Sequence, residues 1–296
     1  IKNFMKTYQK INTMYKRYQH LNKNTCPNKK WLEFSNKIIL GDFSNKEAEY
    51  LFDVKWEVTS KIDGTNSKIA YYPSSGEIKV GGKSDTADSL HGQFEYLQAI
   101  ADRIKPILAE MYPKECARFS QVLDDNKKPI YEDVDWNESK KIVTLEEEPI
   151  YIYGEYYGNG VQKGGSYIKD GNDFIVFDIR QQGWWIPSAM RHEICEKLGL
   201  KEVPSLGMMS LREAEKLVID GFKTLLPNVS DPSLIEEGVV CRTPINLKAS
   251  NGERIIVKIK HKDYVAYSKV RSKFTDDEFK EFSDWYDSYL KQIENQ

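Results

Sequence analysis

The spacing of hydrophobic residues divides the chain into segments with two different periods. Near the amino end, hydrophobic side chains recur every three or four positions, at Ile1, Met5, Tyr8, Ile11, Tyr15 and Tyr18. This spacing predicts an amphipathic helix over residues 1–20, with lysines on its polar side. Those lysines form either a solvated face or a contact surface.

The pattern changes to strand-like alternation after a polar stretch at residues 22–30. Residues 56–60 alternate and lead into Lys61, residues 67–72 continue the alternation, and residues 77–80 follow a Pro-Ser-Ser-Gly turn. Short alternating runs that are separated by turn residues predict an antiparallel meander.

Helical and strand-like segments then follow each other irregularly. We expect helices at 91–117, 187–198, 210–225 and 275–296, and strands at 144–157, 174–179, 237–242 and 254–259. Capping boxes open the last two helices, and the charged segment 124–141 is expected to be a surface excursion. This order predicts an α+β fold of antiparallel sheets flanked by helices, with a cleft between them.

Composition narrows the class of protein. The 296 residues include 40% hydrophobic and 12% aromatic residues, as in a folded globular protein, and the net charge of -2 gives no overall attraction for nucleic acid. The four cysteines lack the spacing of a zinc ribbon or disulfide framework. No apolar run approaches the roughly 20 residues that span a bilayer, and the amino end lacks the centre of a secretion signal. We expect a cytoplasmic monomer with no membrane partner, and a fragment or processed form because the sequence begins at Ile1.

Two short sites supply groups that can attack or hold a nucleotide. Lys61 lies in Ser-Lys-Ile-Asp-Gly-Thr-Asn at residues 60–66, between a strand and a glycine, where a side chain can enter a cleft. A lysine amine attacks phosphorus only when it is neutral. Glu155, beside Gly154, is either an acceptor for ribose hydroxyls or an exposed strand acid.

Three later sites add a ring, a carboxylate and a cationic patch. Phe177 is either a stacking surface for a base or a core aromatic, and Glu237 is a candidate metal ligand followed by an aliphatic stretch. Lys258 and Lys260 are alternate residues of a strand, so they share a face that suits phosphate. We expect this patch to lower the pKa of Lys61.

The order of these sites resembles the motifs of ATP-dependent polynucleotide ligases and capping enzymes. The resemblance rests on Lys61-Ile62-Asp63-Gly64-Thr65-Asn66, Tyr153-Gly154-Glu155, Phe177-Asp178, Glu237-Gly238-Val239-Val240 and Lys258-Ile259-Lys260. The Gly-Thr-Asn ending is similar to RNA ligases of the phage and kinetoplastid RNA-editing type, since DNA ligases and capping enzymes usually have arginine two places after the glycine.

The resemblance extends from about residue 35 to 265 and implies a nucleotidyltransferase (ATP-grasp-like ligase) fold. The expected parts are an N-terminal helical extension at 1–30, an adenylyltransferase domain at 31–270 and a C-terminal helix at 271–296. The implied reaction has three steps. Lys61 takes AMP from ATP, the AMP passes to an RNA 5′-phosphate, and a 3′-hydroxyl displaces it.

The resemblance also implies a role for each site residue. Glu155 would hold the ribose, Phe177 would stack on adenine opposite Val239, and Lys258 and Lys260 would hold the α-phosphate. Mg²⁺ (or Mn²⁺) would be held by Glu155 and Glu237. The other expected nucleotide contacts are Ser60, Ile62, Asn66 and Lys83, the last standing where the family usually has arginine.

Several alternatives remain open at this point. A capping-type guanylyltransferase or a DNA ligase would share the lysine chemistry, and an inactive RNA-end-binding protein would share the cleft. Related ligases commonly carry a further RNA-engaging domain, whereas about 36 residues follow Lys260. The resemblance therefore implies self-adenylylation more directly than joining of RNA ends.

Overall fold

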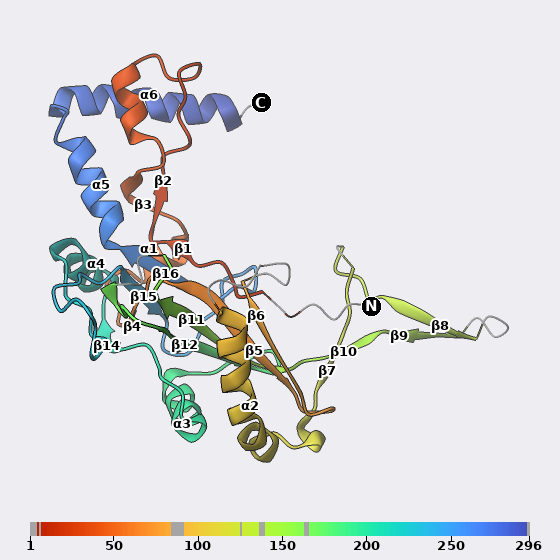
Figure 1. The fold of residues 1–296 in the computed structure, drawn as a ribbon. Helices are drawn as coiled ribbons and strands as arrows, with labels where there is room; N and C mark the ends of the chain where they lie inside the picture. The colour runs from red at the N-terminus through yellow and green to blue at the C-terminus, as the bar shows by residue number, and fades with distance from the viewer. Residues whose placement is uncertain are drawn as a thin grey trace.

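Two five-stranded sheets form the body of the protein in the computed structural model, which describes residues 5, 7–83, 92–124, 126–135, 140–162 and 166–294 (Figure 1). The first sheet has the order β1-β16-β15-β4-β14, with β1 (Asn12–Thr13), β16 (Ile256–Lys260), β15 (Gly238–Arg242), β4 (Trp56–Ser60) and β14 (Ser205–Met209). The second has the order β13-β12-β11-β5-β6, with β13 (Trp184–Trp185), β12 (Asn172–Gln181), β11 (Ile150–Gly158), β5 (Thr65–Tyr72) and β6 (Glu77–Gly82). All pairs except β1·β16 are antiparallel, which confirms the predicted α+β class.

The chain passes from one sheet to the other at residues 61–64. This short segment joins β4 of the first sheet to β5 of the second and has no regular secondary structure. At Gly64 a Cβ atom would lie 2.4 Å from the carbonyl oxygen of Tyr156, so only glycine allows the crossing chain to approach β11 this closely. The crossing places Lys61 at the junction of the two sheets.

Helices cover one face of each sheet. On the second sheet, α2 (Gln93–Met111) and α3 (Ser188–Leu198) bury a core that includes Leu97, Ile104 and Leu198 against strand residues such as Ile152 and Val176. On the first sheet, α4 (Leu211–Asp220) and the short α1 (Lys46–Tyr50) cover a core that includes Trp56, Val58, Ala214, Val218 and Val239. The opposite face of the second sheet carries a tyrosine cluster, with Tyr72, Tyr151 and Tyr153.

Two narrow ribbons extend from the body (Figure 1). One pairs β7 (Phe119–Gln121) with β10 (Leu145–Glu147), and the other pairs β8 (Tyr131–Asp135) with β9 (Lys140–Val143). A 3₁₀ turn, η2 (Lys114–Cys116), connects α2 to them. The predicted excursion at 124–141 thus includes a strand pair, although residues 125 and 136–139 lie outside the described ones.

The helix predicted over residues 1–20 is wrong for the part of that range that the structure describes. Residues 7–11 have no regular secondary structure, β1 pairs with β16, and β2 (Tyr15–Arg17) pairs with β3 (Ile38–Phe43). The apolar residues pack against three separate cores: Tyr8 against the tyrosine cluster, Met14 against the first sheet and Tyr18 against the C-terminal helix. An extended chain reaches all three, whereas a helix presents one stripe to one core.

The C-terminal part of the chain folds together with residues 18–36. Two helices, α5 (His261–Arg271) and α6 (Asp276–Glu294), follow β16, and the sequence pattern indicated only the second. The predicted capping box is confirmed, because the Thr275 amide donates to Glu278 Oε2 at 2.8 Å and the Glu278 amide donates to Thr275 Oγ1 at 3.2 Å. Phe282 of α6 stacks on Phe34 of η1 (Lys29–Phe34), with ring centroids 4.4 Å apart.

Among the described residues, no helix has the combined length and apolar character that a membrane crossing requires.

Candidate active site

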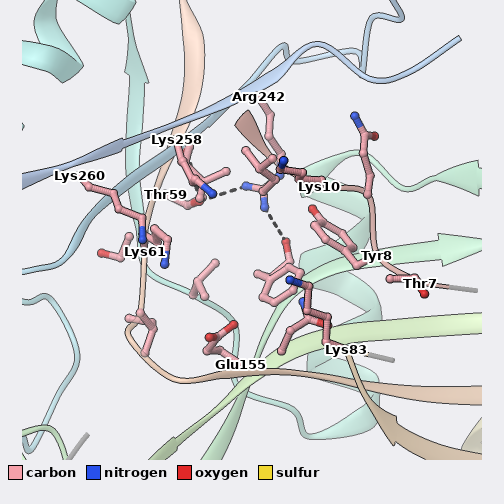
Figure 2. A pocket seen from close by; sticks show the side chains of 18 residues that line it. Thr7, Tyr8, Lys10, Thr59, Lys61, Lys83, Glu155, Arg242, Lys258 and Lys260 are labelled. Atoms are coloured by element: carbon pink, nitrogen blue, oxygen red, sulfur yellow. Dashed lines mark hydrogen bonds between the residues drawn. The ribbon is translucent and has the colours of Figure 1, made fainter. Parts of the chain in front are cut away.

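A pocket of about 420 Å³ lies where the two sheets meet (Figure 2). The chain crossing at 61–64, strands β11, β12, β15 and β16, and an N-terminal strap formed by residues 7–11 all contribute to its walls. The structure brings together, in this one pocket, most of the residues that the sequence motifs indicated: Ser60, Lys61, Ile62, Asn66, Lys83, Glu155, Phe177, Lys258 and Lys260.

Three lysines gather on one side of the pocket, across from Tyr8 and Lys83 (Figure 2). The backbone amide of Lys61 donates to the carbonyl oxygen of Gly238 at 3.0 Å, which ties the end of β4 to β15. Lys61 Nζ forms an ion pair with Glu237 Oε2, and Lys260 Nζ lies 2.7 Å from Glu237 Oε1. A single carboxylate therefore bridges Lys61 and Lys260, although Glu237 does not line the pocket itself.

The prediction that neighbouring cations lower the pKa of Lys61 is wrong. Burial lowers the pKa of Lys61, but the carboxylates of Glu237 and then Glu155 outweigh this effect and raise that pKa above its ordinary value. It is the pKa of Lys258 that is lowered instead, to about 8, because of burial and the charges of Lys260 and Lys61. With its pKa raised, Lys61 is an ammonium ion at neutral pH, and an ammonium ion cannot act as a nucleophile.

Glu155 faces the pocket from β11, opposite Asn66 of β5. Burial raises the pKa of Glu155 to about 7, and the lowering effect of Lys61 only partly opposes the effects of burial, Glu237 and Asp63. The carboxyl group is therefore close to half-protonated at neutral pH, which sets it apart from an exposed strand acid.

This raised pKa predicts a pH dependence of stability. A carboxyl whose folded-state pKa exceeds its unfolded value stabilises the protein below the unfolded pKa, near 4.5, and that contribution is lost as pH rises through about 7. Between pH 4.5 and 8, the free energy of unfolding of the wild type should fall relative to that of Glu155→Gln by about 3 kcal/mol, because 1 pKa unit corresponds to about 1.4 kcal/mol. Urea unfolding of both proteins without nucleotide measures this difference, and parallel pH profiles would contradict it.

A β-bulge directs Phe177 into the pocket. In the β11·β12 ladder Tyr153 pairs with Asp178 and Gly154 pairs with Val176, so Phe177 is the extra residue on β12. At Gly154 a Cβ atom would lie 2.4 Å from the ring of Phe174, so the close packing here requires glycine. The Phe177 ring meets Tyr8 of the strap edge to face, with centroids 5.0 Å apart.

The structure corrects the predicted aliphatic wall of the pocket. Val239 is fully buried in the core of the first sheet, whereas Val240 lines the pocket. Simple alternation would place Glu237 and Val239 on the same side, but Gly238 has a φ of +154° and breaks the alternation between them. A Cβ atom at Gly238 would lie 2.0 Å from the Ile259 carbonyl oxygen, so no other residue fits there.

The sequence motifs missed a buried charged network behind the pocket. Asp178 lies 2.7 Å from Arg254 and 3.8 Å from Arg242, and it accepts a hydrogen bond of 2.8 Å from the hydroxyl of Tyr8. Arg242 also donates to Thr59 Oγ1 and to the Phe177 carbonyl oxygen, each at 3.0 Å. Arg242 could have been recognised from the sequence, because it is a charged residue at the end of the apolar strand β15. No local pattern marks Tyr8 as part of this site.

Comparison with known proteins places the chain in a family. The model of the RNA ligase family matches residues 54–260, so the chain belongs to the RNA ligase family. A search of curated proteins gives no match to the chain.

Solved structures of Naegleria gruberi RNA ligase are similar to this chain. A lysine-to-alanine mutant with ATP and Mn matches with 19% identity and a TM-score of 0.48, over 76% of this chain and 54% of that chain. A glutamate-to-alanine mutant with ATP and Mn matches with 17% identity and a TM-score of 0.48, over 90% of this chain and 60% of that chain. The chain thus spans little more than half the length of these structures.

Proposed function

We propose that this protein is an ATP-dependent RNA ligase that attaches AMP to Lys61 and then uses it to seal RNA ends. One observation carries the proposal: the predicted nucleophile Lys61 and the predicted phosphate ligand Lys260 converge on the two oxygens of Glu237, although the two lysines are distant in sequence. Membership of the RNA ligase family supports the same conclusion.

In the first step the neutral amine of Lys61 attacks the α-phosphorus of ATP. A P–N bond forms, the bond between the α-phosphorus and the bridging oxygen breaks, and pyrophosphate leaves with that oxygen's electron pair. Because Glu237 holds Lys61 as an ammonium ion, the amine must first lose a proton. Once Glu237 is engaged elsewhere, the positive charges of Lys258 and Lys260 favour release of this proton to water.

Glu237 and Glu155 are the residues that would hold Mg²⁺ or Mn²⁺. Within the described part of the chain, no group of three or more His, Cys, Asp or Glu side chains forms a ready-made metal site. Two carboxylates beside a polyphosphate pocket fit a hard cation, because phosphate oxygens complete its shell. The bound ion would neutralise charge that develops on the phosphate oxygens.

The charge of the pocket suits RNA ends despite the net charge of -2 for the whole chain. Glu155 is the one acidic residue in its described lining, whereas the basic lining residues are Lys10, Lys61, Lys83, Arg242, Lys258 and Lys260. In the second step AMP moves from Lys61 to the 5′-phosphate of RNA, and in the third a 3′-hydroxyl attacks that phosphate and releases AMP. In each step negative charge builds up on the nonbridging phosphate oxygens, and these cations offset it.

Phe177 is expected to provide the stacking surface for adenine, in a pocket that Val240 also lines. Phe177→Ala should weaken ATP binding by about 1 to 3 kcal/mol through lost stacking. Isothermal titration calorimetry measures the change, with Trp184→Ala as the control because Trp184 is an exposed aromatic residue on the neighbouring β13. An unchanged dissociation constant for Phe177→Ala would exclude the stacking role.

The proposed function is tested by mass spectrometry and by sealing assays. Incubation with ATP and Mg²⁺ should add one AMP to the intact protein, and peptide mapping should locate it at Lys61. An adduct from GTP alone would instead indicate a capping-type enzyme, and sealing of nicked DNA but not RNA would indicate a DNA ligase. RNA binding without any adduct would indicate an inactive end-binding protein.

A further inference from the structure

Backbone hydrogen bonds hold the segment that carries Lys61 at both of its ends. At its start, the Ser60 amide donates to the Pro204 carbonyl oxygen at 2.9 Å, and the Lys61 amide donates to Gly238 at 3.0 Å. Further along, the Asp63 amide donates to the hydroxyl oxygen of Tyr167 at 3.3 Å. A side chain from the β11–β12 connection thus supports the segment on the side where it turns into β5.

Tyr167 is itself fixed from several directions. It is 3% exposed, and its ring packs edge to face against Tyr157, with centroids 5.7 Å apart. Its carbonyl oxygen accepts a hydrogen bond of 2.9 Å from the Ser230 amide. The hydroxyl group is therefore placed by packing and by backbone contacts, and it has little freedom to follow the segment if the segment moves.

The hydroxyl of Tyr167 ends at a second buried carboxylate, Glu236. This residue is 1% exposed, and it accepts hydrogen bonds from Tyr167 at 3.2 Å and from Thr224 Oγ1 at 2.9 Å. Its own amide donates to the Phe222 carbonyl oxygen at 2.9 Å. Glu236 precedes Glu237 in the chain but forms no described ion pair with Lys61 or Lys260. The two adjacent carboxylates therefore have different partners: Glu237 binds the two lysines, and Glu236 accepts from Tyr167.

The directions of the two hydrogen bonds at the Tyr167 hydroxyl link Glu236 to the backbone of the segment that carries Lys61. A hydroxyl has one hydrogen to donate, and Tyr167 donates it to Glu236, which leaves the tyrosine oxygen free to accept from the Asp63 amide. Glu236 thus orients Tyr167, and Tyr167 in turn fixes the backbone two residues after the nucleophile. A chain of buried hydrogen bonds that is fully satisfied makes such a segment rigid.

We propose that Tyr167 and Glu236 are positioning residues for the attack by Lys61, acting through the Asp63 amide without touching ATP. This inference rests on the proposed function, because it concerns the adenylylation step. The side chain of Lys61 must place its nitrogen in line with the α-phosphorus, and its reach depends on the backbone that carries it. If a substitution outside the reacting groups displaces the attacking nitrogen by about 1 Å, the rate can fall about 100-fold.

The test compares Tyr167→Phe with Tyr157→Phe. Each change removes one hydroxyl from the same aromatic pair, but the hydroxyl of Tyr157 donates to Asp173 at 3.3 Å and does not contact the 61–64 segment in any described hydrogen bond. Single-turnover labelling with ATP gives the maximal rate of adduct formation and the ATP concentration for half-maximal rate. We expect Tyr167→Phe to lower the maximal rate by about tenfold to 100-fold and to leave the half-maximal concentration within about threefold.

A second pair of variants separates positioning from general packing. Glu236→Gln keeps an acceptor for Tyr167, whereas Glu236→Met fills similar space without one. Glu236→Gln should retain most of the maximal rate, and Glu236→Met should lose it about as Tyr167→Phe does. Thermal unfolding midpoints confirm that each variant is folded under the assay conditions.

The outcomes separate this inference from the proposed function. If the wild type forms the adduct and Tyr167→Phe behaves like Tyr157→Phe, the positioning role is overturned while the proposed function stands. A change confined to the half-maximal ATP concentration would also overturn it, since it would show a role in binding. If the wild type forms no adduct, the proposed function fails, and this inference fails with it.

Discussion

Lys61→Ala is expected to abolish formation of the AMP adduct while the protein remains folded. The substitution removes the attacking nitrogen, and no other lysine in the described pocket follows β4 at the crossing between the sheets. Glu237 retains Lys260 as an ion-pair partner at 2.7 Å, so the change leaves no isolated buried carboxylate. Labelling with ATP that carries a radioactive α-phosphate, followed by denaturing electrophoresis, measures the adduct.

Lys55→Ala serves as the control for this experiment. Lys55 precedes the same strand but is exposed, and it forms an ion pair with Glu213 outside the pocket. Its removal should leave labelling unchanged. A fully labelled Lys61→Ala protein would show that another residue is the nucleophile.

Asp178→Ala is expected to cause the largest loss of stability among these variants. Asp178 is completely buried, and its carboxylate neutralises the guanidinium groups of Arg254 and Arg242 and accepts from Tyr8. Burial by itself raises the pKa of Asp178, but Arg254 and Arg242 outweigh that effect and hold the pKa below its ordinary value. Removal of the carboxylate leaves buried positive charges without their partner, which should lower the free energy of unfolding by about 3 to 5 kcal/mol.

Urea unfolding, followed by tryptophan fluorescence, measures this loss. The matched control is Asp53→Ala, because Asp53 forms an ion pair of 2.8 Å with Arg212 on the surface, where both side chains are well exposed. Water replaces the lost partner there, so the stability should hardly change. Equal effects of the two substitutions would show that burial of the Asp178 network contributes nothing.

Motif order predicted which groups line the pocket because the motifs have local signatures: Lys61 follows a strand, Glu155 follows a glycine, and Lys258 and Lys260 alternate along a strand. Lys61, Glu155, Phe177, Lys258 and Lys260 all line one pocket in the structure. The family resemblance placed Val239 in the pocket wall, whereas Val240 lines the pocket because it pairs with the pocket residue Lys258. The roles assigned to these residues remain predictions.

Long-range contacts account for what local patterns could not show. The spacing of Tyr8, Met14 and Tyr18 fits a helix, but these residues pack against cores whose other members lie far along the chain. Likewise, the pKa of Lys61 depends on which carboxylate comes near it in space, and no local pattern pairs it with Glu237. Tertiary packing overrides local propensity in such cases.

The pairing of β1 with β16 has a consequence for biosynthesis. Asn12 and Thr13 pair with Val257 and Lys258, and Gln9 Nε2 donates to the Arg254 carbonyl oxygen at 3.1 Å. Contacts between such distant residues carry a high loop-closure cost and form late in folding. During translation the strap therefore cannot make these contacts until residues 254–258 have left the ribosome, so a nascent protein lacks one wall of its pocket until then.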